Sequence, residues 1–123
     1  MKYIKVLPDI TLTRPNGRGL IDETGREVLI PLSFKEFVFG RLSDARFSKD
    51  METMLRAFEI KIQIEKMSDY LVLEDADWKL LEEVTKKPDQ QTAYRPDIAL
   101  SQLPFIKAIV DATSTDPREK VDN

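Results

Sequence analysis

Three carboxylates lie close together at Glu74, Asp75 and Asp77, a grouping that could bind a hard cation such as Mg²⁺ through its oxygens. No second carboxylate group and no phosphate-holding loop accompanies them in the sequence. The same spacing is typical of a helix N-terminus, where acidic side chains meet the positive end of the helix dipole. We therefore interpret the cluster as the start of a helix and predict no metal site.

The segment from Arg14 to Gly19 contains two arginines and two glycines, residue types that can surround a phosphate group. It has neither the Walker pattern nor the glycine spacing of dinucleotide-binding loops. Asn16-Gly17 is instead a strong turn signal, because glycine accepts a positive φ without steric cost. The segment predicts a turn without a ligand, and we expect no cofactor.

Catalytic chemistry has few candidate residues, since the chain contains no histidine and no cysteine. Histidine is the commonest metal ligand and the side chain that titrates nearest neutral pH, and cysteine would supply thiolates and disulfides. Ser33 with Lys35, or Tyr70 and Tyr94 near lysines, could supply a nucleophile or a base. Nothing in their spacing specifies such a reaction, so we predict no catalytic residue and a protein that is not an enzyme.

Charge is distributed unevenly along the chain, whose net charge is −3. Residues 1–50 carry nine Lys/Arg and seven Asp/Glu, whereas residues 51–123 carry ten and fifteen. Neither half has the clustered cations that nucleic-acid binding requires. A nucleic-acid binder and a carboxylate-dependent enzyme remain alternatives that the composition does not favour.

The length of 123 residues suits one hydrophobic core, and 41% of the residues are hydrophobic. We expect a single domain over residues 1–113, followed by a polar tail at 114–123 that is mobile unless a partner orders it. No apolar run approaches the roughly 18 residues that span a bilayer, and the N-terminal apolar segment stops at Pro8-Asp9. A protein of the cytoplasm without a membrane partner is therefore expected.

Short β-branched runs at residues 3–7, 10–13, 20–21 and 28–30 are separated by turn signals. They predict two hairpins or a small meander. Ser33-Phe34-Lys35-Glu36 then has the spacing of a capping box, which marks the start of a helix. A short extended run follows at residues 70–73, and Asp75 is expected to cap a helix that Pro88 stops.

Residues 58–65 are ambiguous, because their apolar residues fit both a helix that starts at Ser48 and an alternating strand. No turn signal interrupts residues 51–65, so we favour a helix to about Met67. After a polar connector at residues 88–95, a last helix from Pro96 should be kinked or split at Pro104. The predicted fold class is α+β: an N-terminal β-hairpin region followed by about four packed helices.

The helical interpretation gives the segment around residues 58–67 two apolar faces. One face, formed by Met51, Leu55, Phe58 and Ile62, is assigned to the core. The second face is then either sandwiched within the core or free for a partner, and we favour the partner. Phe39 points away from the apolar stripe of its own helix. The predicted partner-binding residues are Phe39, Ile60, Ile64 and Met67. In the strand interpretation the isoleucines share a face with Phe58 and are buried.

Taken in order, several short motifs resemble small accessory proteins of tailed-bacteriophage gene clusters; they lie at residues 22–26, 34–38, 42–47, 73–78 and 103–106. The resemblance implies a virion-associated or assembly role in which the partner is another phage protein, often in many copies. We therefore expect a protein-binding accessory factor, such as a phage structural component or assembly chaperone, that binds another protein or itself. It would be found in the host cytoplasm or the virion. An inhibitor that blocks a host protein is the alternative within the same class.

Overall fold

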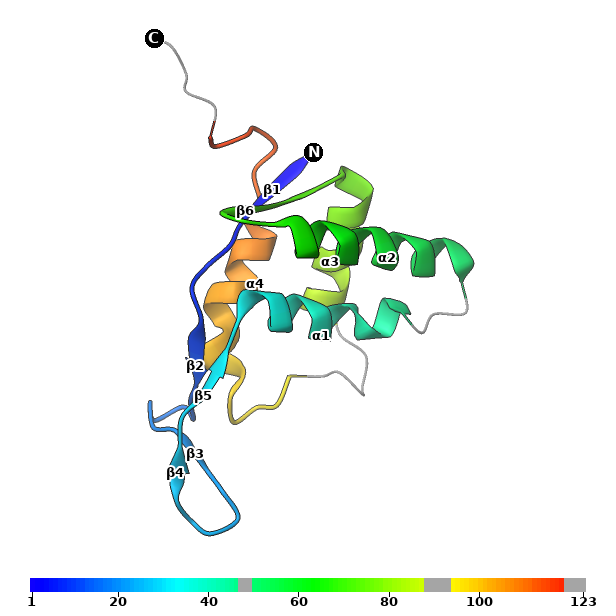
Figure 1. Ribbon diagram of the computed structural model, residues 1–123. Helices are drawn as coiled ribbons and strands as arrows, with labels where there is room; N and C mark the ends of the chain where they lie inside the picture. The colour runs from blue at the N-terminus through cyan, green and yellow to red at the C-terminus, as the bar shows by residue number, and fades with distance from the viewer. Residues whose placement is uncertain (47–49, 88–93, 119–123) are drawn as a thin grey trace.

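The computed structural model describes residues 1–46, 50–87 and 94–118, in which an N-terminal strand region precedes the helices (Figure 1). This order confirms the predicted α+β class. The elements are β1 (Lys2–Lys5), β2 (Ile10–Leu12), β3 (Leu20–Ile21), β4 (Glu27–Val28), β5 (Ile30–Leu32), α1 (Phe34–Arg46), α2 (Met51–Lys66), β6 (Tyr70–Leu73), α3 (Asp75–Lys86), the 3₁₀ helix η1 (Ala99–Gln102) and α4 (Leu103–Val110).

The strand pairing agrees in part with the predicted two hairpins or small meander: the hairpin around residues 22–25 is present, whereas β1 does not pair with β2. β1 pairs antiparallel with the distant β6, β2 pairs with β5, and β3 pairs with β4. β2 to β5 therefore form one long, interrupted hairpin, which projects from the helices at the end opposite the N-terminus (Figure 1). β1 leaves this hairpin because Ile4 is fully buried in the core, beside Leu71 and Leu73 of β6.

Two turns shape the hairpin. The loop between β2 and β3 closes on itself where the N–H of Arg14 donates to the carbonyl of Arg18 at 2.8 Å. Gly17 has a φ of 83° there, which confirms the turn predicted at Asn16-Gly17. At the tip, the Asp22 carboxylate accepts hydrogen bonds from the N–H groups of Thr24 and Arg26 at 2.8 and 2.9 Å.

Helix α1 begins where the capping box predicts it. The N–H of Glu36 donates to the Ser33 hydroxyl oxygen at 3.1 Å, and that hydroxyl donates to the Glu36 carboxylate at 3.0 Å. One free N–H group of the first turn is thereby satisfied. The apolar face of α1 is buried against α2 and α3, and consists of Phe34, Phe37, Val38 and Leu42.

Helix α2 confirms the helical interpretation of residues 58–65. Its first turn is capped by Asp50, whose carboxylate accepts a hydrogen bond from the N–H of Glu52 at 3.0 Å. The predicted cap at Ser48 lies outside the described residues. Within residues 1–46, 50–87 and 94–118, every helix falls short of the length and apolar character needed to cross a bilayer.

The last helices depart from the prediction in detail. Glu74, not Asp75, occupies the N-cap position of α3, and it makes no side-chain capping bond. The predicted split near Pro104 is confirmed, because η1 ends at Gln102 and Pro104 lies in the first turn of α4, where a missing N–H costs nothing. Most of the predicted connector, residues 88–93, lies outside the described part of the chain.

The core lies where α1, α2, α3 and α4 meet the β1–β6 pair. Phe105 of α4 packs edge-to-face on Phe34 of α1, with ring centroids 5.4 Å apart. Trp78 of α3 donates its indole N–H to the carbonyl of Ile109 at 2.8 Å. These contacts hold the C-terminal helix against the rest of the fold.

Thr113, the last residue of the predicted domain, and Ser114, the first of the predicted polar tail, both contact β1. Thr113 forms an isolated antiparallel bridge with Tyr3, through hydrogen bonds of 2.8 and 3.1 Å. The Arg118 guanidinium lies 5.9 Å from the ring of Tyr3 and 5.8 Å from the ring of Tyr70. Residues 119–123 are outside the described residues.

Candidate interaction surfaces

The predicted partner-binding residues do not form an exposed stripe. Ile60 and Ile64 are 0% and 2% exposed and belong to the core. Met67 and Phe39 are half-buried and pack against that core, and the Lys35 ammonium lies 5.7 Å from the Phe39 ring. The predicted surface is therefore wrong, because α2 turns its Ala57, Ile60 and Ile64 face toward the body of the fold.

The apolar residues that α2 exposes are those that the sequence interpretation assigned to the core. Met51, Leu55, Phe58 and Ile62 are 65%, 60%, 62% and 41% exposed. We call these four residues the outer face of α2. Their successive spacings of four, three and four residues are those of the a and d positions of a coiled coil. The outer face thus has the pattern of a helix seam that packs against another helix.

Charged side chains border the outer face of α2. Glu65 pairs with Lys35 of α1 at 2.9 Å, and Arg56 pairs with Glu52 one turn earlier at 3.2 Å. Glu59 and Lys61 are also exposed, and they form no ion pair within the described ranges. An apolar strip with a polar rim is the usual anatomy of a protein-binding surface.

The acidic cluster separates into residues with different surroundings. Asp75 lies 3.0 Å from the N-terminal ammonium group, whereas Asp77 is buried and lies 3.5 Å from Arg56. Burial raises the pKa of Asp77, and the nearby Arg56 guanidinium opposes that rise. In the part of the chain that the structure describes, no three side chains of metal-ligating type come together.

The candidate nucleophiles take part in structural contacts. Ser33 belongs to the α1 cap, and Lys35 pairs with Glu65. The Tyr94 hydroxyl donates to the carbonyl of Thr85 at 2.9 Å, and burial raises its pKa. Tyr70 borders the groove described next. The Ser33 hydroxyl does donate to a carboxylate, that of Glu36, but this pair forms the capping box at the start of α1.

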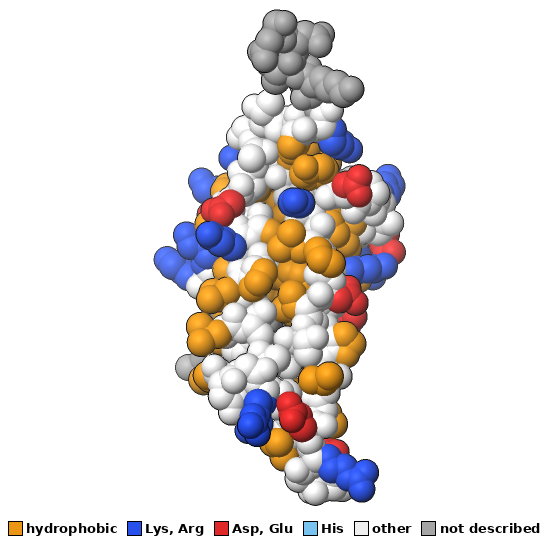
Figure 2. Space-filling view, turned by 90° about the vertical axis from the view of Figure 1, so that its left-hand side faces the viewer, with side chains coloured by type: hydrophobic (Ala, Val, Ile, Leu, Met, Phe, Trp, Pro, Cys, Tyr) orange, Lys and Arg blue, Asp and Glu red, His pale blue; other side chains and the backbone are white. Residues whose placement is uncertain are grey.

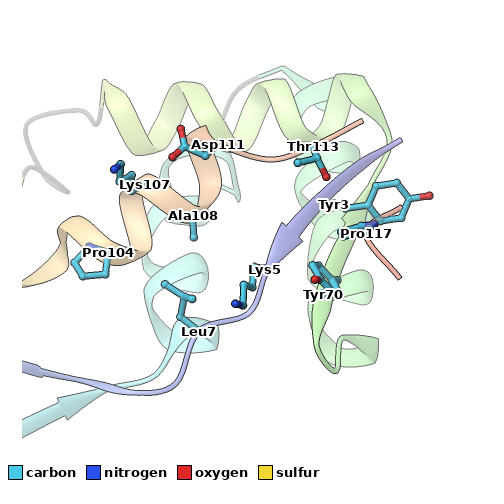
Figure 3. A pocket seen from close by; sticks show the side chains of 10 residues that line it. All are labelled: Tyr3, Lys5, Leu7, Tyr70, Pro104, Lys107, Ala108, Asp111, Thr113 and Pro117. Carbon is cyan, nitrogen blue, oxygen red and sulfur yellow. The ribbon is translucent and has the colours of Figure 1, made fainter. Parts of the chain in front are cut away.

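A groove of about 390 Å³ lies between β1 and α4, and sequence reasoning did not identify it. Figure 2 shows hydrophobic side chains gathered in the middle of the face that carries these elements. Figure 3 shows the side chains along the two walls and at one end. They are Tyr3 and Lys5 of β1 with Leu7 just after it, Pro104, Lys107 and Ala108 of α4 with its C-cap Asp111, and Tyr70, Thr113 and Pro117. We call this hollow the β1–α4 groove.

The sequence does not predict this groove, because the residues that form its two walls lie about a hundred positions apart in the chain. Its strand contributes alternate residues and its helix contributes residues three and four apart, which are ordinary periodicities of surface elements. Only the packing of α4 on β1 brings the two sets together.

Comparisons of the chain with family models, with curated proteins and with solved structures find no match. A functional assignment therefore depends on the outer face of α2 and on the β1–α4 groove.

Proposed function

We propose that this protein is a protein-binding accessory factor whose main contact is the outer face of α2. The observation that carries the proposal is the exposure of four large apolar side chains, from Met51 to Ile62, at coiled-coil spacing. Exposed apolar patches on a small domain mark sites of association, because water is released when a partner covers them.

The size of the outer face supports a role in assemblies. A standard stable interface engages about 20 to 30 residues on each side, far more than one seam of a 16-residue helix supplies. Each contact is then weak by itself and gains strength where several copies or several contacts act together. Such use of weak, repeated contacts suits a structural component or an assembly chaperone.

A phage setting for this role depends on the sequence resemblance alone. The motifs that carry the resemblance are helix caps and apolar anchors, such as Phe34 to Val38 at the start of α1. The proposal of a protein-binding factor stands without that setting, since it depends on the surface of α2.

The test compares two double variants of the full chain. Leu55→Ser with Phe58→Ser removes the centre of the outer face of α2, and Ile21→Ser with Leu29→Ser removes equally exposed apolar side chains from the hairpin. Association is measured by sedimentation over a range of concentrations and by affinity capture from the native cells. We expect the wild type and the hairpin variant to associate alike, and the α2 variant to remain monomeric and folded by circular dichroism.

Two results would contradict the proposal. One is a wild-type chain that stays monomeric at high concentration and captures no partner. The other is an α2 double variant that associates as the wild type does. A tight one-to-one complex with one host protein, lost in the α2 variant, would keep the binding surface and favour the inhibitor alternative.

A further inference from the structure

We propose that the β1–α4 groove binds an extended peptide of a partner protein, as an added strand on β1, with an acidic side chain placed between Lys5 and Lys107. The proposal concerns a surface separate from the outer face of α2. Its first support is an open strand edge, its second is the shape and lining of the groove, and its third is the charge on the rim.

The open edge follows from the register of β1. Ile4 pairs with Leu71 of β6, and the next N–H on that side, of Val6, donates to the carbonyl of Asp69 at 3.0 Å. Tyr3 directs its N–H and C=O the opposite way, to Thr113. Because these groups alternate in direction along a strand, the N–H and C=O of Lys5 also point away from β6.

In the described part of the chain, no strand pairs with Lys5 on that side. Within the described residues, pairing on this edge of β1 consists of the single bridge between Tyr3 and Thr113. An unpaired strand edge is a template for another strand, and main-chain hydrogen bonds to it give affinity that is independent of sequence. The edge at Lys5 is therefore available to a peptide.

The lining of the groove suits an extended peptide. Its strand wall runs from Tyr3 to Leu7, but Thr113 already pairs with Tyr3. The part open to a peptide therefore runs from Lys5 to Leu7, a span of about 7 Å at the usual rise per residue, which matches about two to three residues of a second strand. α4 forms the opposite wall, where Pro104 and Ala108 present small apolar surfaces (Figure 3). A peptide paired with β1 would place every second side chain against this apolar wall.

The positive charges on the rim of the groove favour a peptide that carries an acidic residue. Lys5 and Lys107 stand on the two walls and are both exposed. Neither forms an ion pair with any other residue in the ranges that the structure describes. Asp111 lies toward the Thr113 end (Figure 3). The middle of the groove thus favours a peptide with an acidic residue between apolar or β-branched neighbours.

The experiment begins with random nine-residue peptides displayed on yeast and selected on the full-length chain. We expect enriched sequences with an acidic residue flanked by apolar or β-branched residues. One enriched peptide is synthesised with a fluorescent label, and its dissociation constant is measured by polarisation. Failure to enrich any sequence would overturn the proposal.

Charge reversal tests the site on the protein. Lys5→Glu with Lys107→Glu should weaken the peptide about tenfold, since two favourable charge contacts become repulsive. The matched control, Lys61→Glu with Lys79→Glu, changes the same total charge at exposed positions outside the groove and should leave affinity unchanged. Equal affinity of the two double variants would place the peptide elsewhere and overturn the proposal.

A peptide modification tests strand pairing without any change in the protein. Two forms of the peptide are made, with N-methylation at one residue or at the next. In a paired strand, successive N–H groups point to opposite sides, so one methyl group blocks pairing with Lys5 and the other does not. We expect one form to lose at least tenfold in affinity and the other to bind as before. Equal effects of the two methyl groups would show that the peptide does not pair with β1.

Discussion

Phe58 and Ile60 project from opposite sides of α2, although one residue separates them. Phe58 is 62% exposed, whereas Ile60 is fully buried in the core. Two helical steps turn the side chain by about 200° around the axis, so an apolar pair that would share a strand face is divided by a helix. Substitutions at these two positions should therefore affect different properties of the protein.

The first prediction compares serine at the two positions. Ile60→Ser should lower the free energy of unfolding by about 3 kcal/mol or more, because it leaves a cavity and buries a hydroxyl group. Phe58→Ser should change it by at most about 0.5 kcal/mol, as expected for an exposed side chain. Urea denaturation followed by circular dichroism measures both values. A larger loss at Phe58 than at Ile60 would mean that the assigned faces of α2 are reversed.

The sequence predicted the helices well because their signals are local. The capping box from Ser33 to Glu36 and the split near Pro104 depend on residues within one or two turns. The helical interpretation of residues 58–65 was also correct. What failed was the choice between the two apolar faces of α2, since periodicity gives the angle between faces and not the side on which the rest of the chain packs.

The hairpin of β3 and β4 was predicted from its local turn, but the pairing of β1 could not be predicted in the same way. β1 and β6 are separated by more than sixty residues, and each alone is a short apolar run with the signal of a hairpin strand. Their pairing follows from the burial of Ile4 and Leu71 in one core, a tertiary effect. The β1–α4 groove forms only because β1 pairs with β6 and α4 packs beside β1, so no local sequence motif predicts it.

The second prediction concerns the α1 cap. Ser33→Ala removes the oxygen that accepts the N–H of Glu36 and should lower the free energy of unfolding by about 1 kcal/mol. Ser68→Ala is the matched control, because Ser68 is exposed between α2 and β6 and its side chain makes no hydrogen bond within the described ranges. Thermal melting of the two variants should differ. Identical melting temperatures would show that the cap contributes nothing to stability.

The third prediction concerns the contact between α3 and α4. Trp78→Phe removes the indole N–H that donates to the carbonyl of Ile109, and should destabilise the fold by about 1 to 2 kcal/mol. The Lys2 ammonium lies 4.7 Å from the Trp78 ring and also donates to the Ser114 hydroxyl at 2.9 Å, so Lys2→Ala tests the contacts of this cation separately from the indole hydrogen bond. That control should cost at most about 1 kcal/mol. Chemical denaturation measures both, and a larger loss for Lys2→Ala would assign the stabilisation to the cation.

The last prediction concerns the pH dependence of stability. Burial raises the pKa of Asp77 above its ordinary value of 3.8, and the attraction of Arg56 does not cancel the rise. Between the unfolded and folded pKa values the folded state binds more protons, so this residue makes the free energy of unfolding fall as the pH rises. Above the folded pKa its contribution no longer changes.

Asp77→Asn should remove that decrease, and Asp22→Asn provides a control of opposite sign. The hydrogen bond from the Thr24 hydroxyl lowers the pKa of Asp22, so this carboxylate adds stability above its unfolded pKa that is lost as the pH falls through the folded pKa. Urea denaturation at intervals from pH 3 to 7 gives the free energy of unfolding of each protein. The quantity compared is the value for the wild type minus the value for the variant. With rising pH, the difference should fall for Asp77→Asn and rise for Asp22→Asn. Curves of the same sign would show that the burial of Asp77 does not outweigh its pairing with Arg56.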